Sequence, residues 1–192
     1  MKLPREFYLR DGLTVARDLI GKKLVTKLPE GIASGIIVET EAYMGTSDAA
    51  AHSFRGKTER TKIFYGAGGF VYVYLIYGMY ICTNVVANIE NAPEAVLIRA
   101  LEPIGGVDLM KSRRGKKNLR DLCSGPGKLS QALGITKKFY GADLCGEEIF
   151  IEDTDFKVAL ESTKRINIDY AGEAADYLWR FIAAGNKFLS VK

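Results

Sequence analysis

The chain has very little histidine and cysteine, and this scarcity argues against several kinds of active site. His52 is the only histidine among 192 residues, and the three cysteines, Cys82, Cys123 and Cys145, lie far apart with no Cys-x-x-Cys pair. Zinc and iron–sulfur sites need clusters of such ligands, and an odd number of scattered cysteines does not suit a disulfide framework. We expect no metal and no cofactor, so the chemistry is left to carboxylates, hydroxyls, arginines and water.

Long hydrophobic runs are also missing. No segment approaches the roughly 20 apolar residues that cross a membrane, and residues 1–10 carry charges where a signal peptide needs an apolar stretch. The composition, 47% hydrophobic and 26% charged, is typical of a globular protein. We expect an intracellular protein with no membrane partner, folded as one domain over residues 1–192. The net charge of +4 permits a polyanionic partner without demonstrating one.

Strand patterns outnumber helix patterns along the chain. The predicted strands cover residues 23–28, 32–43, 70–77, 79–84, 95–100, 148–152, 164–169 and 187–191. The predicted helices are a segment capped by Asp11 and ended by Gly21, and residues 104–112, 124–133 and 172–178. Because the helices are short and irregularly placed, we predict an α+β domain with a curved antiparallel or mixed sheet and a protruding β-hairpin.

The predicted hairpin carries a large aromatic residue at its tip. Aromatic and β-branched residues alternate from Phe70 to Tyr77, and the pattern resumes after Gly78 and continues to Asn84. A tip offers Tyr77 no burial within its own chain. A flat side chain at such a position suits a protein that inserts a wedge between stacked bases.

A second pattern places acidic residues on one side of a strand. Glu39, Glu41 and Tyr43 alternate with Thr40 and Ala42, so the first three share one face. Taken alone, this segment favours a solvated sheet face, while a general base that activates water is the functional alternative. A paired-acid glycosidase is the weaker enzyme hypothesis, because carboxylates roughly 7 Å apart on one strand point in parallel and do not flank a bond.

Several motifs together resemble the alkyladenine (3-methyladenine) DNA glycosylase family. In the family's order they are Glu39-Thr40-Glu41-Ala42-Tyr43, Ala50-Ala51-His52-Ser53, Tyr72-Val73-Tyr74, Tyr77-Gly78-Met79-Tyr80, Arg99-Ala100-Leu101-Glu102-Pro103, Cys123-Ser124-Gly125-Pro126 and Ala171-Gly172-Glu173. The resemblance covers nearly the whole chain from about Pro4. It implies double-stranded DNA with damaged purines as the partner, and hydrolysis of the N-glycosidic bond of an alkylated or deaminated purine that has left the base stack.

The resemblance also assigns the reacting groups. It implies that Glu41 is the general base that activates a water, and that Arg99 supports this glutamate and the water. A main-chain carbonyl near Ile166 would be the other contact of the water. The product would be an abasic site, and the enzyme a DNA-associated monomer.

The base pocket and the wedge follow from the same resemblance. Tyr43, His52 and Tyr74 match its aromatic walls, and Asn84 matches the residue that discriminates against guanine. Tyr77 matches the residue that intercalates where the nucleotide left. Each position also has an ordinary structural explanation: a satisfied histidine for His52, core packing for Tyr74, a hairpin cap for Asn84.

Basic residues cluster in two segments, which predicts contacts with DNA phosphates. The candidates are Lys57, Arg60, Lys62, Lys111, Arg113, Arg114, Lys116, Lys117 and Arg120, together with Ser124, Gly125 and Lys128 before a helix. A solvated loop and a plain helix cap are the alternatives. Two other functions stay open, a non-catalytic damaged-DNA-binding module and a bifunctional glycosylase/lyase in which Lys57 or Lys62 attacks the sugar.

Overall fold

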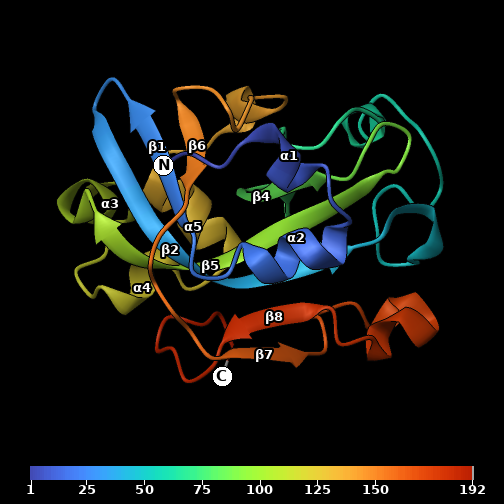
Figure 1. The fold of residues 1–192 in the computed structure, drawn as a ribbon. Coiled ribbons are helices and arrows are strands. Elements are labelled where there is room, and N and C mark those ends of the chain that lie inside the picture. The colour runs from blue at the N-terminus through green and yellow to red at the C-terminus, as the bar shows by residue number, and fades with distance from the viewer. Residues whose placement is uncertain (192) are drawn as a thin grey trace.

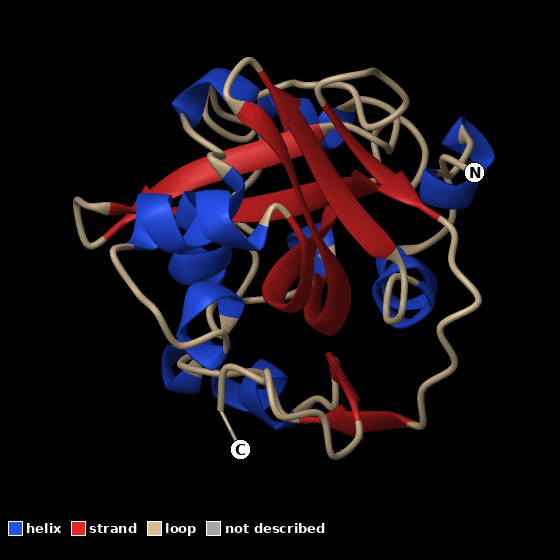
Figure 2. Cartoon of the chain, turned by 90° about the vertical axis from the view of Figure 1, so that its left-hand side faces the viewer, coloured by secondary structure: helices blue, strands red, loops and turns tan. Residues whose placement is uncertain are grey.

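The long strand β2 (Gly31–Tyr43) organises the computed structural model, which describes residues 1–191 (Figure 1). Its eight-stranded antiparallel sheet also contains β1 (Lys23–Leu28), β3 (Val71–Ile76), β4 (Tyr80–Ala87), β5 (Glu94–Gly105), β6 (Ile149–Glu152), β7 (Leu160–Thr163) and β8 (Arg180–Ala183). One edge of β2 pairs with β5, and the other pairs first with β1 and then with β8. The sheet is strongly twisted and curved (Figure 2). The α+β prediction is confirmed.

The helices are short. They are α1 (Arg5–Tyr8), α2 (Gly12–Asp18), α3 (Val107–Arg114), α4 (Arg120–Cys123) and α5 (Pro126–Leu133), with 3-10 turns η1 (Gly45–Ser47), η2 (Lys62–Tyr65), η3 (Lys137–Phe139) and η4 (Asp169–Asp176). The side chain of Asp11 accepts a hydrogen bond from the Thr14 N–H at 3.0 Å, as the predicted cap of α2 requires. Gly134 adopts a left-handed conformation after α5, which confirms the predicted end of that helix.

The packing of α2 decides which face of β2 carries the acidic residues. The Thr40 hydroxyl donates to the Ala16 carbonyl of α2 at 2.8 Å, so Thr40 points toward this helix. Because side chains alternate along a strand, Glu39 and Glu41 point to the opposite face. The group α3, α4 and α5 packs against β2, β4 and β5, and a Thr83–Ser130 hydrogen bond of 2.8 Å joins β4 to α5.

The hairpin of β3 and β4 has the predicted position and turn. Tyr77 and Gly78 both have positive φ, 52° and 71°, and the Met79 N–H donates to the Ile76 carbonyl at 3.2 Å. These are the features of a type I′ turn, whose twist matches the flanking strands. Tyrosine is uncommon in this conformation, so the backbone at Tyr77 carries some strain.

The second half of the chain departs from the prediction in four places. Strands are absent from residues 164–169 and 187–191, where the described chain is irregular, and the pair β7–β8 forms instead. All four residues of β8 are buried, so this strand has no alternating pattern to detect. The helix expected at 172–178 is the 3-10 turn η4, broken at Gly172. Strand β5 continues to Gly105, which shifts the following helix to Val107–Arg114.

Candidate active site

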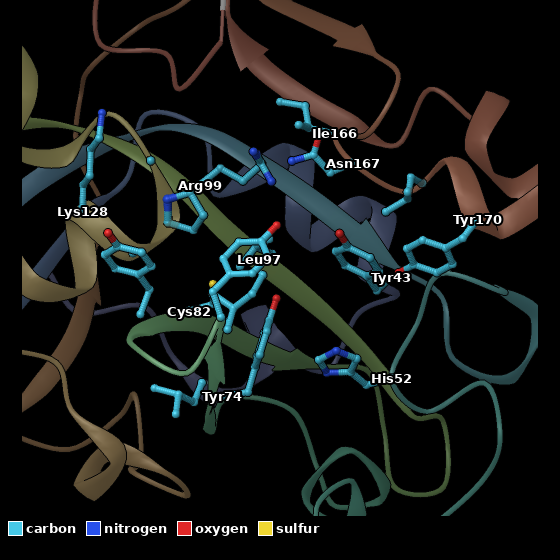
Figure 3. Close-up of a pocket in the computed structure, with 18 of the residues that line it drawn as sticks. Tyr43, His52, Tyr74, Cys82, Leu97, Arg99, Lys128, Ile166, Asn167 and Tyr170 are labelled. Carbon is cyan, nitrogen blue, oxygen red and sulfur yellow. The ribbon is translucent and has the colours of Figure 1, made fainter.

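A cavity of about 690 Å³ opens between the β3–β4 hairpin, the start of α5 and the segment 166–170 (Figure 3). Its walls include Tyr43, Tyr74, Arg99, Lys128 and Tyr170. A smaller cavity of about 60 Å³ adjoins it and shares Tyr43, His52, Tyr74 and Tyr170. The predicted residues Tyr43, His52, Tyr74 and Arg99 therefore come together from four separate parts of the chain.

Glu41 lies fully buried beside this cavity, with both carboxylate oxygens hydrogen bonded. Oε1 accepts from the Ile166 N–H at 2.7 Å. Oε2 accepts from the Tyr43 hydroxyl at 2.8 Å and from Arg99 Nη1 at 3.3 Å. Glu39 and Glu41 are both 0% exposed, so a solvated sheet face is the wrong interpretation of this strand. A buried carboxylate with three fixed donors keeps a defined orientation.

The main chain of Ile166 reaches Glu41 through its N–H. The sequence predicted a role for its carbonyl as a contact of the water, and that role stays a prediction. The neighbouring Arg165 is fully buried and donates both terminal nitrogens to Asp48, at 2.5 and 2.9 Å. This ion pair anchors the segment that presents the Ile166 N–H to Glu41.

An irregularity of the sheet aims Arg99 at the acidic residues. In the pairing of β2 with β5, Glu39 lies opposite Ala100 and Thr40 lies opposite Ile98, which leaves Arg99 as the extra residue of a bulge. Burial acts to lower the pKa of Arg99, but the carboxylates of Glu41 and Glu39 outweigh it and raise that pKa. Arg99 is therefore a permanent cation next to Glu41.

The rings of His52, Tyr72 and Tyr74 form a connected cluster, and Figure 3 shows two of them, His52 and Tyr74, at the cavity. The ring of His52 meets that of Tyr74 edge to face, with centroids 4.6 Å apart. His52 Nδ1 lies 3.0 Å from the Tyr72 hydroxyl, which accepts a hydrogen bond from Arg60 Nε at 2.9 Å. Desolvation and the nearby Arg60 guanidinium lower the pKa of His52 to about 4, so the imidazole is neutral at pH 7.

Two of the tyrosines that line the cavity, Tyr43 and Tyr74, stay protonated at neutral pH. Burial raises the pKa of Tyr43 well above its usual value, and the Glu41 carboxylate raises it further. Burial likewise raises the pKa of Tyr74. Tyr43 is therefore a hydroxyl donor to Glu41 and offers an uncharged ring to a ligand.

Asn84 is 5% exposed and lines the smaller cavity but not the larger one. Its Nδ2 donates to the Tyr72 carbonyl at 3.2 Å. Tyr77 lies at the opposite extreme, on the rim of the larger cavity, with 77% of its surface exposed. One residue is held rigidly inside the protein, and the other is free to contact a partner.

The predicted phosphate-binding residues fall into three groups. Some are engaged with the protein: Lys62 pairs with Glu59 at 2.9 Å, Lys111 with Asp108 at 3.2 Å and Arg113 with Glu30 at 2.7 Å, Arg120 donates to the Lys187 carbonyl at 2.9 Å, and Lys57 lies over the Tyr65 ring. A second group lines the cavity, namely Arg60, Arg114, Gly125 and Lys128, while Ser124 is buried beside Lys128. Lys116 and Lys117 are exposed to solvent. The basic segments are therefore not one uniform surface.

Four residues near the site were given no role by sequence reasoning. Tyr72 orients His52, Tyr170 lines both cavities, and Arg180 and Ser190 bind Glu39. Tyr72 lies in a motif of the family, which was a usable signal. No local pattern marks Arg180 or Ser190, because their partner is distant along the chain.

The part of the chain that the structure describes lacks two features. Residues 1–191 contain no group of three or more histidine, cysteine, aspartate or glutamate side chains placed to hold a metal ion. No helix in that range is long and apolar enough to cross a membrane.

Comparisons with known proteins show what this chain is similar to. The sequence model of a family described as methylpurine-DNA glycosylase (MPG) matches residues 6–187. A protein of Clostridium novyi (strain NT) named "Putative 3-methyladenine DNA glycosylase" is 51% identical over 200 residues, covering 100% of this chain and 99% of the relative. Proteins of the same name from Alkaliphilus oremlandii (strain OhILAs), 51% identical with 100% of both chains covered, and Methanocella arvoryzae (strain DSM 22066 / NBRC 105507 / MRE50), 49% identical with 93% and 90% covered, are also similar.

Proposed function

The chain belongs to the methylpurine-DNA glycosylase family, and from that premise we propose that it hydrolyses the N-glycosidic bond of alkylated or deaminated purines in double-stranded DNA. The observation that carries the proposal is the place of Glu41. Its carboxylate is buried next to a cavity walled by aromatic rings, and Tyr77 is exposed at the rim of that cavity. A water beside Glu41 would lie where the sugar of a flipped nucleotide enters.

Glu41 acts as the general base in this proposal. Three donors hold its oxygens, and the remaining lone pairs are available to orient and deprotonate a water that attacks the anomeric carbon. As the C–O bond to the anomeric carbon forms, the C–N bond to the purine breaks and an abasic site remains. A cationic alkylated purine leaves as the neutral base, whereas a neutral deaminated purine leaves as an anion that takes up a proton from solvent. Arg99 balances the negative charge of the Glu41 carboxylate and keeps that carboxylate oriented toward the sugar.

His52 and the tyrosines recognise the flipped base. Tyr43 and Tyr74 provide faces for stacking, which every purine offers. The Tyr72 hydroxyl accepts a hydrogen bond from Arg60 and donates its own proton to His52 Nδ1. The neutral imidazole therefore carries its proton on Nε2, which can donate a hydrogen bond to a base in the cavity. Asn84 limits the depth available to a base, so it contributes selectivity through shape.

DNA is held around the cavity by the wedge and by the start of α5. Tyr77 fills the gap left by the flipped nucleotide and offsets part of the cost of unstacking. Helix α5 begins at Pro126 with no side-chain cap, and Lys128 in its first turn lines the cavity. A phosphate next to the flipped nucleotide binds there, because a helix N-terminus and a lysine both attract anions.

The test is base release from duplexes that each carry one lesion: 3-methyladenine, 7-methylguanine, hypoxanthine or ethenoadenine. We expect free base from at least one of them, with strand breaks only after alkali treatment and no protein–DNA adduct after borohydride. Neither Lys57 nor Lys62 lines the cavity, which favours water over a lysine as the nucleophile. If no duplex releases free base, the proposal is wrong. If borohydride traps a protein–DNA adduct, the enzyme acts as a lyase through a lysine and not by hydrolysis alone.

A further inference from the structure

A second buried carboxylate shares Arg99 with Glu41, although it does not line the cavity. Glu39 is 0% exposed and accepts four hydrogen bonds. Its donors are Arg99 Nε at 3.0 Å, Arg180 Nε at 2.8 Å, and both the N–H and the hydroxyl of Ser190 at 2.7 Å. A group this completely satisfied is held in one orientation, and it holds its partners in turn.

The buried cluster of Glu39, Glu41, Arg99 and Arg180 is neutral as a whole. Glu39 and Glu41 supply two negative charges, and Arg99 and Arg180 supply two positive ones. Burying an unmatched charge is costly. With Arg180 paired to Glu39, one of the two guanidinium charges remains to balance Glu41. Arg180 is itself held by the Thr163 hydroxyl at 2.9 Å and the Val191 carbonyl at 3.2 Å.

The same cluster determines how Arg99 is turned. Its Nε faces Glu39, its Nη1 faces Glu41 and its Nη2 faces the Ser190 hydroxyl at 3.5 Å. None of these three partners lines the cavity itself, but Glu41 alone among them is also bound by two residues that do, Tyr43 and Ile166. The guanidinium cannot rotate away from Glu41 without breaking the bond to Glu39, which is also the shorter of its two carboxylate contacts.

We propose that Glu39, Arg180 and Ser190 are positioning residues, which hold Arg99 against Glu41 and so determine the rate of the chemical step. This inference rests on the proposed function. The segment at Ser190 lies 151 residues from Glu39 in the sequence and closes the cluster from the far side. The residues contact neither the cavity nor a bound nucleotide, so they affect bond hydrolysis and leave lesion binding alone.

The experiment compares Glu39→Gln, Ser190→Ala and Ser190→Thr with the wild-type chain on one lesion duplex. Single-turnover base release with enzyme in excess gives a rate constant and an amplitude, and binding is measured separately on a duplex with a non-hydrolysable abasic analogue. We expect the rate constant to fall about 10- to 100-fold for Glu39→Gln, because a small displacement of a reacting group has an effect of this size. The rate constant falls less for Ser190→Ala than for Glu39→Gln. Ser190→Thr keeps the hydroxyl, so its rate constant stays close to that of the wild-type chain. The Kd for the abasic-analogue duplex is the same for all variants.

Thr26→Val is the matched control. The Thr26 hydroxyl is fully buried and donates to the Leu133 carbonyl at 2.7 Å, in a strand away from the cavity. This variant loses stability and amplitude on heating but keeps the wild-type rate constant. A purely structural role for Glu39 and Ser190 predicts the same behaviour, and that result overturns the inference. If the wild-type chain itself releases no base, the proposed function fails first, and the positioning role fails with it.

Discussion

The buried cluster around Glu41 and the exposed tip of the hairpin at Tyr77 are held in place in opposite ways. Glu41 is bound by Arg99 and Ile166, which lie 58 and 125 residues away in the sequence. The tip is shaped by the four residues of its own turn, closed by one hydrogen bond between Ile76 and Met79. One region is therefore a product of the whole fold, and the other is a product of local chain geometry.

This difference shows where each part of the function can tolerate change. Buried charges are stable only when every partner is present, so the cluster is rigid and sensitive to distant substitutions. The ring of Tyr77 is 77% exposed and adds little to folding, so its side chain is available for binding. Four substitutions test this difference between the buried cluster and the exposed tip.

Glu41→Gln should have the largest effect. Glutamine keeps the shape of the side chain but cannot take a proton from water, so base release falls by about 10² to 10⁴-fold. Binding to lesion DNA is retained, because the aromatic walls and Tyr77 are unchanged. Single-turnover release and a binding titration on the same duplex measure the two effects. If this variant releases purine at a near-normal rate, Glu41 is not the general base.

Asp48→Asn tests the rigidity of the region around the cluster. Both Asp48 and Arg165 are fully buried, so the substitution leaves an unpaired cation inside the protein. We expect a loss of about 3 kcal/mol in the free energy of unfolding, measured by urea denaturation. The exposed pair Lys164–Asp176 is the control, since Asp176→Asn should change stability by less than about 1 kcal/mol. Equal losses of stability at the two positions would contradict the expectation that a buried ion pair is far more sensitive than an exposed one.

Tyr77→Ala tests the exposed tip. Loss of the ring removes stacking against a neighbouring base and weakens lesion binding by about 1 to 3 kcal/mol. The free energy of unfolding is unchanged, because the ring is exposed in the free protein. Tyr77→Phe keeps the flat face and serves as the control, with binding close to that of the wild-type chain. An unchanged affinity for Tyr77→Ala eliminates the wedge.

His52 gives the smallest effect, in the dependence of stability on pH. The pKa of His52 is about 4 in the folded protein and about 6.5 in an unfolded chain. Between these values only the unfolded chain takes up the proton, so this contribution to stability is lost as pH falls from 6.5 to 4. Relative to His52→Gln, the wild-type chain should lose about 1 kcal/mol between pH 7 and pH 4.5, a figure reduced for the exposed edge of the ring. Parallel stability curves for the two proteins rule out the shift.

Local features were predictable from sequence because neighbouring residues decide them. Strand β1 has its predicted bounds, and the Tyr77 hairpin, the Asp11 cap of α2 and the Gly134 end of α5 each follow from a few adjacent residues. The site residues came from motif resemblance, and the fold brings Tyr43, His52, Tyr74 and Arg99 together around one cavity.

Other features had no local signal. Nothing in the sequence around Arg99 indicates a bulge, because a bulge depends on how two strands pair. Arg60 is predicted to contact a phosphate, and no local signal indicated that its guanidinium also donates to the Tyr72 hydroxyl. The strand expected at residues 187–191 is absent, and Ser190 in this irregular segment binds the carboxylate of Glu39 instead of pairing with a strand.

The sequence by itself determined the hairpin, the identity of its exposed tip and the alternation that puts Glu39 and Glu41 on one face, since each depends on residues within a few positions. Only the tertiary structure decided that this face is buried, that Arg99 lies between the two carboxylates, and that Ile166, Arg180 and Ser190 complete their hydrogen bonds. A buried charge is stable only beside compensating groups, and long-range chain packing determines which groups those are.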